Sequence, residues 1–156
     1  VINGPAMGAG LELALACDIR IGSEKARLGI PVGKLGITLN NQFAQRLVNL
    51  IGPSLTKDLV YTGRVLKAEE AHRLGMLNYL VKEKDLNRYA IRMGNLVASQ
   101  SPASLLAIKQ SVQECVDSAP ILWNGSTPFV DHNDFPEGVA AFVEKRVPRF
   151  TRRPLK

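Results

Sequence analysis

The stretch NGPAMGAGLELALACD, residues 3–18, passes from a glycine-rich turn directly into an apolar segment. Its glycines, Gly4, Gly8 and Gly10, do not have the spacing of a G-x-G-x-x-G dinucleotide fingerprint, and no Lys-Ser or Lys-Thr pair follows as in a P-loop. From Leu11 to Cys17 every residue except Glu12 is apolar, which is typical of a buried helix. We therefore expect a tight turn that opens a buried helix, without a nucleotide-phosphate site.

Two groups in this stretch are candidates for chemistry. Ala9 lies between two glycines at the expected helix start, so its backbone N–H can stabilise an oxyanion, or the small residues can simply allow close helix–strand packing. Glu12 is a lone carboxylate among apolar residues. Burial would hold it near neutrality and suit it to general acid–base catalysis; alternatively it faces water, or it pairs with Arg20 or Lys34.

The remaining sequence predicts an α/β layered fold, because strand signals near the start give way mainly to helical periodicity. Val1-Ile2 has the character of the end of a buried strand, and Ala26–Leu39, with its glycines and Pro31, that of an irregular loop. Further strands are predicted at Asp18–Gly22 and Met76–Val81. Helices are predicted from Asn40 or Asn41 to Ile51, and at Ser54–Tyr61, Lys67–Leu74, Asp85–Ser99, Ser101–Val116 and Glu137–Arg146.

Composition bounds the class of protein. The chain has 156 residues, 46% hydrophobic and 22% charged, which fits a globular domain with one core and excludes a disordered or collagen-like chain. No apolar run is long enough to cross a membrane. Cys17 and Cys115 lie in apolar helical patterns and are expected to be buried, free thiols in a reducing compartment. His72 and His132 lack metal-ligand spacing, so we expect structural or surface roles and no metal site.

The net charge of +6 is concentrated at one end of the chain. The last twelve residues contain six basic residues and no acidic one: Lys145, Arg146, Arg149, Arg152, Arg153 and Lys156. Such a tail either binds an anionic partner or is simply solvated. Nucleic acid is not the expected partner, because Phe150 is the only aromatic residue in the tail and the chain has no groove-reading motif.

Residues 3–18 resemble the signature of the crotonase (enoyl-CoA hydratase/isomerase) superfamily. The order of the later segments is similar as well: residues 27–31, 35–36, 45–47, 59–63, 68–71, 75–78 and 137–146. This resemblance implies a crotonase-like (ClpP/crotonase) β/α spiral core with a C-terminal helical trimerisation region. It also implies that the chain is the C-terminal portion of the family domain, lacking N-terminal ββα units. Residues 1–100 would belong to the core, and residues 101–156 to the helical region with the basic tail.

The same resemblance implies roles for particular residues. An acyl-CoA thioester would bind with its carbonyl oxygen at the Ala9 amide, between Gly8 and Gly10, and Glu12 would be one of two catalytic glutamates. Two residues of the C-terminal helix, Phe142 and Lys145, would contact the adenine and 3′-phosphate of coenzyme A, often across a subunit interface. The expected assembly is a homotrimer or hexamer, with no cofactor beyond the coenzyme A of the substrate.

One position departs from the family pattern. The second hydratase glutamate would follow Pro31, and this chain has Val32 there. The expected function is nonetheless that of an enoyl-CoA hydratase/isomerase-type lyase that stabilises a thioester enolate. The alternative is a catalytically silent or truncated member that acts in acyl-CoA binding or oligomer assembly. The expected location is the cytoplasm, with a mitochondrial or peroxisomal location as the alternative.

Overall fold

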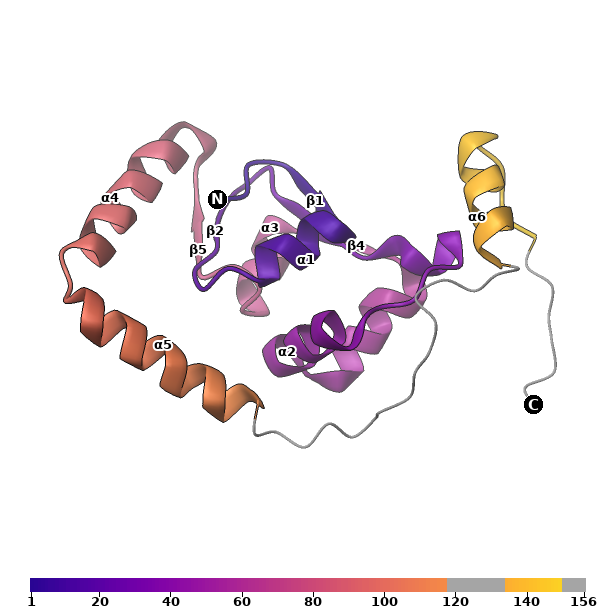
Figure 1. Cartoon of the computed structure of the whole chain (residues 1–156). Helices are drawn as coiled ribbons and strands as arrows, with labels where there is room; N and C mark the ends of the chain where they lie inside the picture. The colour runs from indigo at the N-terminus through magenta and orange to yellow at the C-terminus, as the bar shows by residue number, and fades with distance from the viewer. Residues whose placement is uncertain (118–133, 150–156) are drawn as a thin grey trace.

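The computed structural model describes residues 1–117 and 134–149, and within them short strands alternate with helices (Figure 1). The elements in chain order are β1 (Pro5–Met7), α1 (Ala9–Leu15), β2 (Ile21–Ser23), β3 (Arg27–Gly29), the 3-10 helix η1 (Pro31–Leu35), α2 (Asn41–Thr62), β4 (Val65–Lys67), α3 (Ala68–Arg73), β5 (Tyr79–Val81), the 3-10 helix η2 (Glu83–Asp85), α4 (Leu86–Ala98), α5 (Pro102–Asp117) and α6 (Asp134–Val143). The α/β class predicted from the sequence is confirmed.

The strands form two small sheets. One has the order β1-β3-β4, in which β1 and β3 are parallel and β3 and β4 antiparallel; in the other, β2 pairs with β5 in parallel. Leu28 at the centre of β3 is opposite Ala6 on one side and Leu66 on the other. Because the side chains of a strand alternate between faces, this register directs three apolar side chains to the same side of the sheet.

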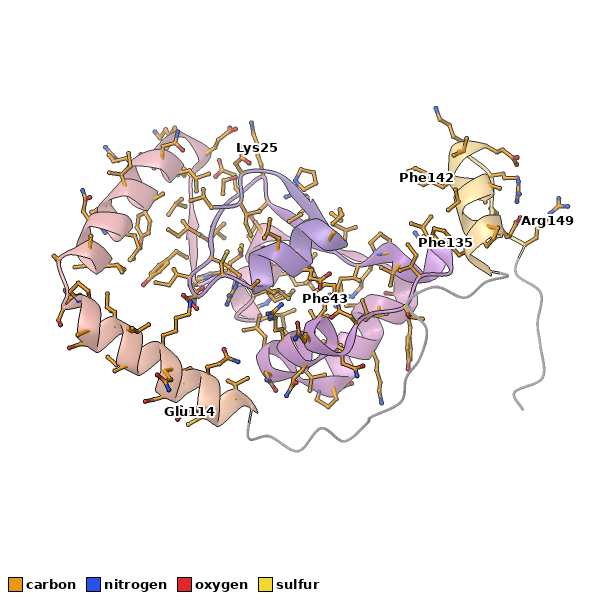
Figure 2. The ribbon with its side chains drawn as sticks, viewed as in Figure 1. Lys25, Phe43, Glu114, Phe135, Phe142 and Arg149 are labelled. Atoms are coloured by element: carbon orange, nitrogen blue, oxygen red, sulfur yellow. The ribbon has the colours of Figure 1, made fainter. Side chains whose placement is uncertain are left out.

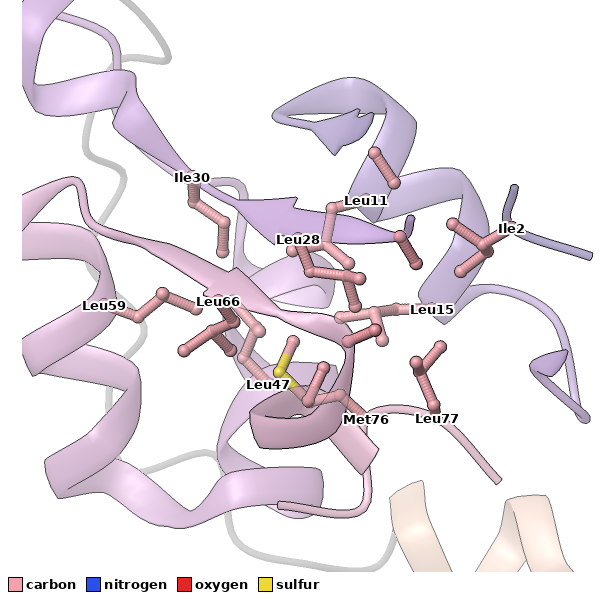
Figure 3. Packing of buried hydrophobic residues seen from close by; sticks show 14 of the residues in the cluster. Ile2, Leu11, Leu15, Leu28, Ile30, Leu47, Leu59, Leu66, Met76 and Leu77 are labelled. Carbon is pink, nitrogen blue, oxygen red and sulfur yellow. The ribbon is translucent and has the colours of Figure 1, made fainter. Parts of the chain in front are cut away.

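Those side chains belong to one hydrophobic core. Leu11 and Leu15 of α1 lie in the same cluster as Leu28 and Leu66 of the sheet and Leu47 of α2 (Figure 3). All of these are buried, and each fully buried leucine contributes about 1.5–3 kcal/mol to stability. The core therefore fixes α1 against the sheet through one face of the helix, and Glu12, next to Leu11, lies half-buried beside it.

The beginning and the kink of α2 follow the sequence signals. Asn40 is the N-cap, and its side-chain Oδ1 accepts a hydrogen bond from the Phe43 N–H at 2.8 Å. Gly52, with φ of 74°, interrupts the helical geometry just before Pro53, where two separate helices were predicted. Gly75, with φ of 78°, follows α3 in the left-handed conformation that glycine adopts without strain. These local predictions are confirmed.

The strand predictions were less accurate. The segment Ala26–Leu39 is not wholly irregular, since it contains β3 and η1, and the strand predicted at Asp18–Gly22 begins only at Ile21. β1 and β4 had no sequence signal. Each observed strand is three residues long, which is too short to display a clear alternation of polar and apolar residues.

The apolar faces of α4 and α5 are buried only in part. Both helices form, and in Figure 1 they extend along one side of the molecule. However, Leu96, Ile108 and Val112 are all exposed. Cys17 and Cys115 are exposed free thiols, so the prediction that they are buried is wrong. The periodicity correctly identified an apolar face in each helix. α4 contacts β2 and buries Leu86, but the three apolar residues named above stay exposed within the described part of the chain.

Helix α6 begins and ends three residues earlier than predicted. The chain leaves the helix at Lys145, whose φ is 53°. α6 packs on η1, and the approach is close because Gly138 faces the backbone of Leu35. Among the described residues no helix is both long and apolar enough to span a membrane.

Candidate active site

The turn between β1 and α1 presents a backbone amide at the start of a helix. Gly8 has φ of 51°, a left-handed conformation that favours glycine, and its N–H donates to the Gly29 carbonyl at 2.9 Å. Ala9 is the first residue of α1, where a helix offers no internal acceptor for the N–H. The chain thus turns sharply from a paired strand into a helix whose first amide is available to a ligand.

Ala9 lies in the wall of a cavity of about 320 Å³, which is within the range of small-molecule sites. Glu12 is the only ionisable residue among those that line it. The remaining lining is mostly apolar; in full it comprises Met7, Gly8, Ala9, Glu12, Pro31, Val32, Leu35, Ile37, Thr38, Leu39, Asn40 and Phe43. Glu12 therefore supplies the single carboxyl of a mostly apolar wall, in which Thr38 and Asn40 are the other polar side chains.

Glu12 has a partner that the sequence did not suggest. Its Oε1 accepts a hydrogen bond of 2.6 Å from Nδ2 of Asn40, across 28 positions of sequence. It is half-buried, between the fully buried and the water-facing alternatives drawn from the sequence, and it pairs with Asn40 instead of with Arg20 or Lys34. Arg20 instead donates to the carbonyls of Met76 and Cys17, both at 2.7 Å, and its burial lowers its pKa.

Val32 also lines the cavity, as the second residue of η1. Among the residues singled out from the sequence, the structure brings Gly8, Ala9, Glu12 and Val32 together. Gly10 is exposed and does not line this cavity. Because Val32 is apolar, the described wall of the cavity has a single carboxylate.

Phe142 and Lys145 lie outside the cavity. Phe142 is 74% exposed on α6, well away from Phe43 of the cavity wall (Figure 2), and Lys145 is exposed just beyond the same helix. The helix nonetheless contacts one residue of the cavity wall, since Gly138 packs on Leu35 and Leu35 lines the cavity. The structure links α6 to the site through η1, without bringing the two predicted coenzyme A contacts into it.

The basic tail is partly neutralised. Arg146 makes a bidentate pair with Glu137, at 2.6 and 3.0 Å, and a further ion pair with Glu144. The Arg149 N–H also donates to Glu137 at 2.6 Å. The side-chain bonds from Arg146, followed by the Arg149 amide, lower the pKa of Glu137 to about 2. Arg146 is therefore committed to α6; Arg152, Arg153 and Lys156 lie outside the described residues.

His72 is not among the residues that line the cavity. His72 Nδ1 lies 3.0 Å from the Leu77 carbonyl, a contact that fits the structural role predicted for it. His132 lies outside the described residues. Within residues 1–117 and 134–149 no group of three His, Cys, Asp or Glu side chains could hold a metal ion.

Sequence reasoning missed Asn40 as a site residue. The sequence identified Asn40 only as a helix cap, because it precedes an amphipathic run. That pattern gives no information about a carboxylate 28 positions earlier. Ile37 and Leu39 of the cavity wall were also missed, because their segment looked like a loop without a preferred face.

Comparison with known proteins supports the resemblance. Residues 1–153 match the family described as enoyl-CoA hydratase/isomerase. The chain is 37% identical to the short-chain-enoyl-CoA hydratase of Clostridium acetobutylicum, over 93% of this chain and 58% of that protein. It is 35% identical to the probable mitochondrial enoyl-CoA hydratase 2 of Arabidopsis thaliana, over 96% and 52%. The crystal structure of an enoyl-CoA hydratase/isomerase from Pseudoalteromonas atlantica superposes with a TM-score of 0.81 at 30% identity, over 95% and 62%.

The chain spans between about half and six tenths of these proteins. The crotonase-type α/β fold is confirmed at this level. Correspondence to the C-terminal portion of the family domain, the division at residue 100 and the trimerisation region stay predictions.

Proposed function

Because the chain belongs to the enoyl-CoA hydratase/isomerase (crotonase) family, we propose that it acts on acyl-CoA thioesters by stabilising an enolate. The Ala9 amide would bind the thioester oxygen, and the Glu12 carboxyl would move a proton at the α-carbon. One observation carries this proposal: Ala9, the first residue of α1, and a lone carboxyl line the same, mostly apolar cavity.

The amide is suited to an oxyanion because it is rigid. Gly8, on one side of it, is tied to β3 by its bond to Gly29, and on the other side Leu11 anchors α1 in the core. A fixed donor needs no reorganisation when charge develops on the oxygen, and one such donor typically contributes about 2.7–4 kcal/mol to transition-state stabilisation. In the family, two backbone amides bind the thioester oxygen and together form an oxyanion hole. In this proposal the Ala9 amide is one of the two.

Glu12 is the group available for proton transfer. It is the only ionisable side chain in the described cavity wall, and it is oriented by Asn40. Proton transfer by a positioned carboxyl typically accelerates a reaction by about 10²–10⁴-fold. In the proposed step a proton passes between this carboxyl and the α-carbon, while the thioester oxygen carries the negative charge of the enolate at Ala9.

The reaction subtype is constrained by Val32. Addition of water by the family mechanism uses one carboxyl for water and one for the α-carbon proton, whereas this wall has one carboxyl. An enolate reaction that needs a single acid, such as decarboxylation of a malonyl-type thioester, is therefore as compatible with the cavity as hydration. The same observation supports a second candidate, a silent member that binds acyl-CoA without turnover.

The surfaces outside the cavity fit wider features of the family proposal. Phe142 and Lys145 are exposed and do not line the cavity. If they contact coenzyme A, they do so with a part of the molecule that lies outside the cavity. Exposed apolar residues on α4, α5 and α6, such as Ile91, Leu106 and Val143, are suited to assembly into a homotrimer or hexamer. A cytoplasmic or organellar location stays a prediction.

The test is turnover of crotonyl-CoA, followed as loss of the conjugated thioester absorbance, by the full-length protein and its Glu12→Gln variant. Glutamine retains an oxygen that accepts the Asn40 bond, so the fold should persist while turnover falls about 10²–10⁴-fold. Glu69→Gln, at an exposed position on α3, is the matched control and should retain full activity.

The outcomes separate the candidates. Turnover that depends on Glu12 supports hydration with one carboxyl. Coenzyme A binding without turnover of crotonyl, 3-enoyl or malonyl-type thioesters supports the silent member. Undiminished turnover by Glu12→Gln contradicts the role of Glu12.

A further inference from the structure

The side-chain amide of Asn40 makes two hydrogen bonds, one as a donor and one as an acceptor. Its Nδ2 donates to Oε1 of Glu12 at 2.6 Å, and its Oδ1 accepts from the Phe43 N–H at 2.8 Å. The amide group therefore connects the carboxyl on α1 to the first turn of α2. Both Asn40 and Glu12 line the cavity.

These two bonds define which way the amide faces. Rotating it by half a turn would set its NH₂ against the Phe43 N–H and its oxygen against the Glu12 carboxylate. Both contacts would then be repulsive. The cap bond at Phe43 thus guarantees that Asn40 presents a donor, and only a donor, to Glu12.

The anchor is rigid. Phe43 is buried in the hydrophobic core, at the start of α2 (Figure 2), so its amide has a fixed position. Glu12 is a long side chain on a short helix and by itself can take several rotamers, at a loss of entropy when one is selected. The bond from Asn40 selects one of them before a substrate arrives.

The bond also distinguishes the two oxygens of the carboxyl. Oε1 is engaged by Asn40, so Oε2 is the oxygen that can exchange a proton without breaking this contact. Because Asn40 is neutral, it orients the carboxyl without adding a positive charge to an apolar cavity. An arginine or lysine in its place would instead form an ion pair that opposes protonation.

We propose that Asn40 is the positioning residue that holds Glu12 in the orientation required for proton transfer. This inference rests on the proposed function of Glu12. A misplacement of about 1 Å in a reacting group can reduce the rate about 10²-fold, so the loss of this bond should lower kcat while leaving substrate affinity largely intact.

The experiment separates the two bonds of Asn40. Asn40→Ser retains a good N-cap but is too short to reach Glu12, so Tm should fall only by the contribution of this one bond, while kcat falls about 10–100-fold and KM stays within about twofold. Asn41→Ser makes the same substitution one position later, at an exposed residue outside the cavity wall, and should leave kcat unchanged.

A second variant gives a readout that a purely structural role would not affect. Asn40→Asp also retains the cap, but it sets a second carboxylate against Glu12. Two carboxylates that share a site do not ionise independently, so the acid limb of the pH–rate profile should move to higher pH in this variant and not in Asn40→Ser. If both variants keep the parent kcat and pH profile, Asn40 only caps α2 and the proposal is wrong.

A measurement without substrate tests the Asn40–Glu12 contact separately from the function proposed for Glu12. If the parent itself turns over no thioester, the function proposed for Glu12 fails. The contact can still be tested in a double-mutant cycle on Tm. Asn40→Ser should lower Tm less in a Glu12→Ala background than in the parent, and equal effects would show that Asn40 does not hold Glu12.

Discussion

Replacement of Gly138 by alanine should destabilise the protein, although alanine is the better helix former. A Cβ at this position would lie 2.5 Å from both the carbonyl carbon and Cα of Leu35. These are backbone atoms, which cannot turn aside as a flexible side chain can. The clash would therefore displace α6 from η1, the segment that carries Val32 and Leu35 of the cavity wall.

The expected magnitude follows from this distance. Carbon atoms in contact are ordinarily about 3.5–4.0 Å apart, so the helix has to move by roughly 1 Å. Overpacking of this kind costs about 1–3 kcal/mol, and the helix propensity of alanine returns about 1 kcal/mol. Because the contact is to backbone, the cost should lie in the upper part of that range, which leaves a net loss of roughly 1–2 kcal/mol, or about 2–8 °C in Tm.

The matched control is Gly94→Ala in α4. Gly94 is exposed, and a Cβ there would meet no atom within 4 Å. Its substitution should raise Tm by about 2–4 °C, because it gains helix propensity without a clash. Thermal unfolding of both variants, with proteolysis of α6 as a local readout, measures the difference. If Gly138→Ala is as stable as the parent, α6 does not pack closely on η1 and does not support the cavity wall.

Three further predictions concern the ion pair of α6, the core and the cavity. Glu137 has its pKa lowered to about 2 from 4.5, so its contribution to stability is present above its ordinary pKa and is lost as pH falls through about 2. The Tm difference between the parent and Glu137→Gln should therefore narrow from pH 5 towards pH 2; a constant difference would contradict the ion pair. Leu28→Ala, at a fully buried position, should lower the free energy of unfolding by about 2–5 kcal/mol in chemical denaturation, and a loss below 1 kcal/mol would contradict its central place in the core. Val32→Glu should raise crotonyl-CoA hydration about 10²-fold or more if one missing carboxyl limits that reaction, and an unchanged rate would contradict this limit.

The helices were predictable because their signals are local. Asn40 as an N-cap, Gly52-Pro53 as a break and the helix at α4 were predicted from neighbouring residues, and the structure confirms each of them. Burial was less predictable than helicity. The apolar face of α5 exists in the sequence, but whether anything covers it depends on residues elsewhere, and in the described part it is exposed.

The site was predictable only in part, for the same reason. Residues 3–18 identified Ala9 and Glu12 because the turn and the lone carboxyl are close in sequence. The partner of Glu12 was not predictable, because the contact with Asn40 forms only when α2 packs beside α1. The three-residue strands that fix the turn at Gly8 were not predictable either, because they are stabilised by pairing with segments distant in sequence.

Exchange of the α-protons of a saturated acyl-CoA with deuterated water tests the enolate and its proton donor most directly, since it requires neither hydration nor decarboxylation. The full-length protein is incubated with butyryl-CoA, and incorporation is followed by mass spectrometry. We expect deuterium to enter the α-position in the presence of the parent and the Glu69→Gln control, and at least about 10²-fold more slowly with Glu12→Gln. Exchange no faster than in buffer, or exchange undiminished in Glu12→Gln, would contradict the account.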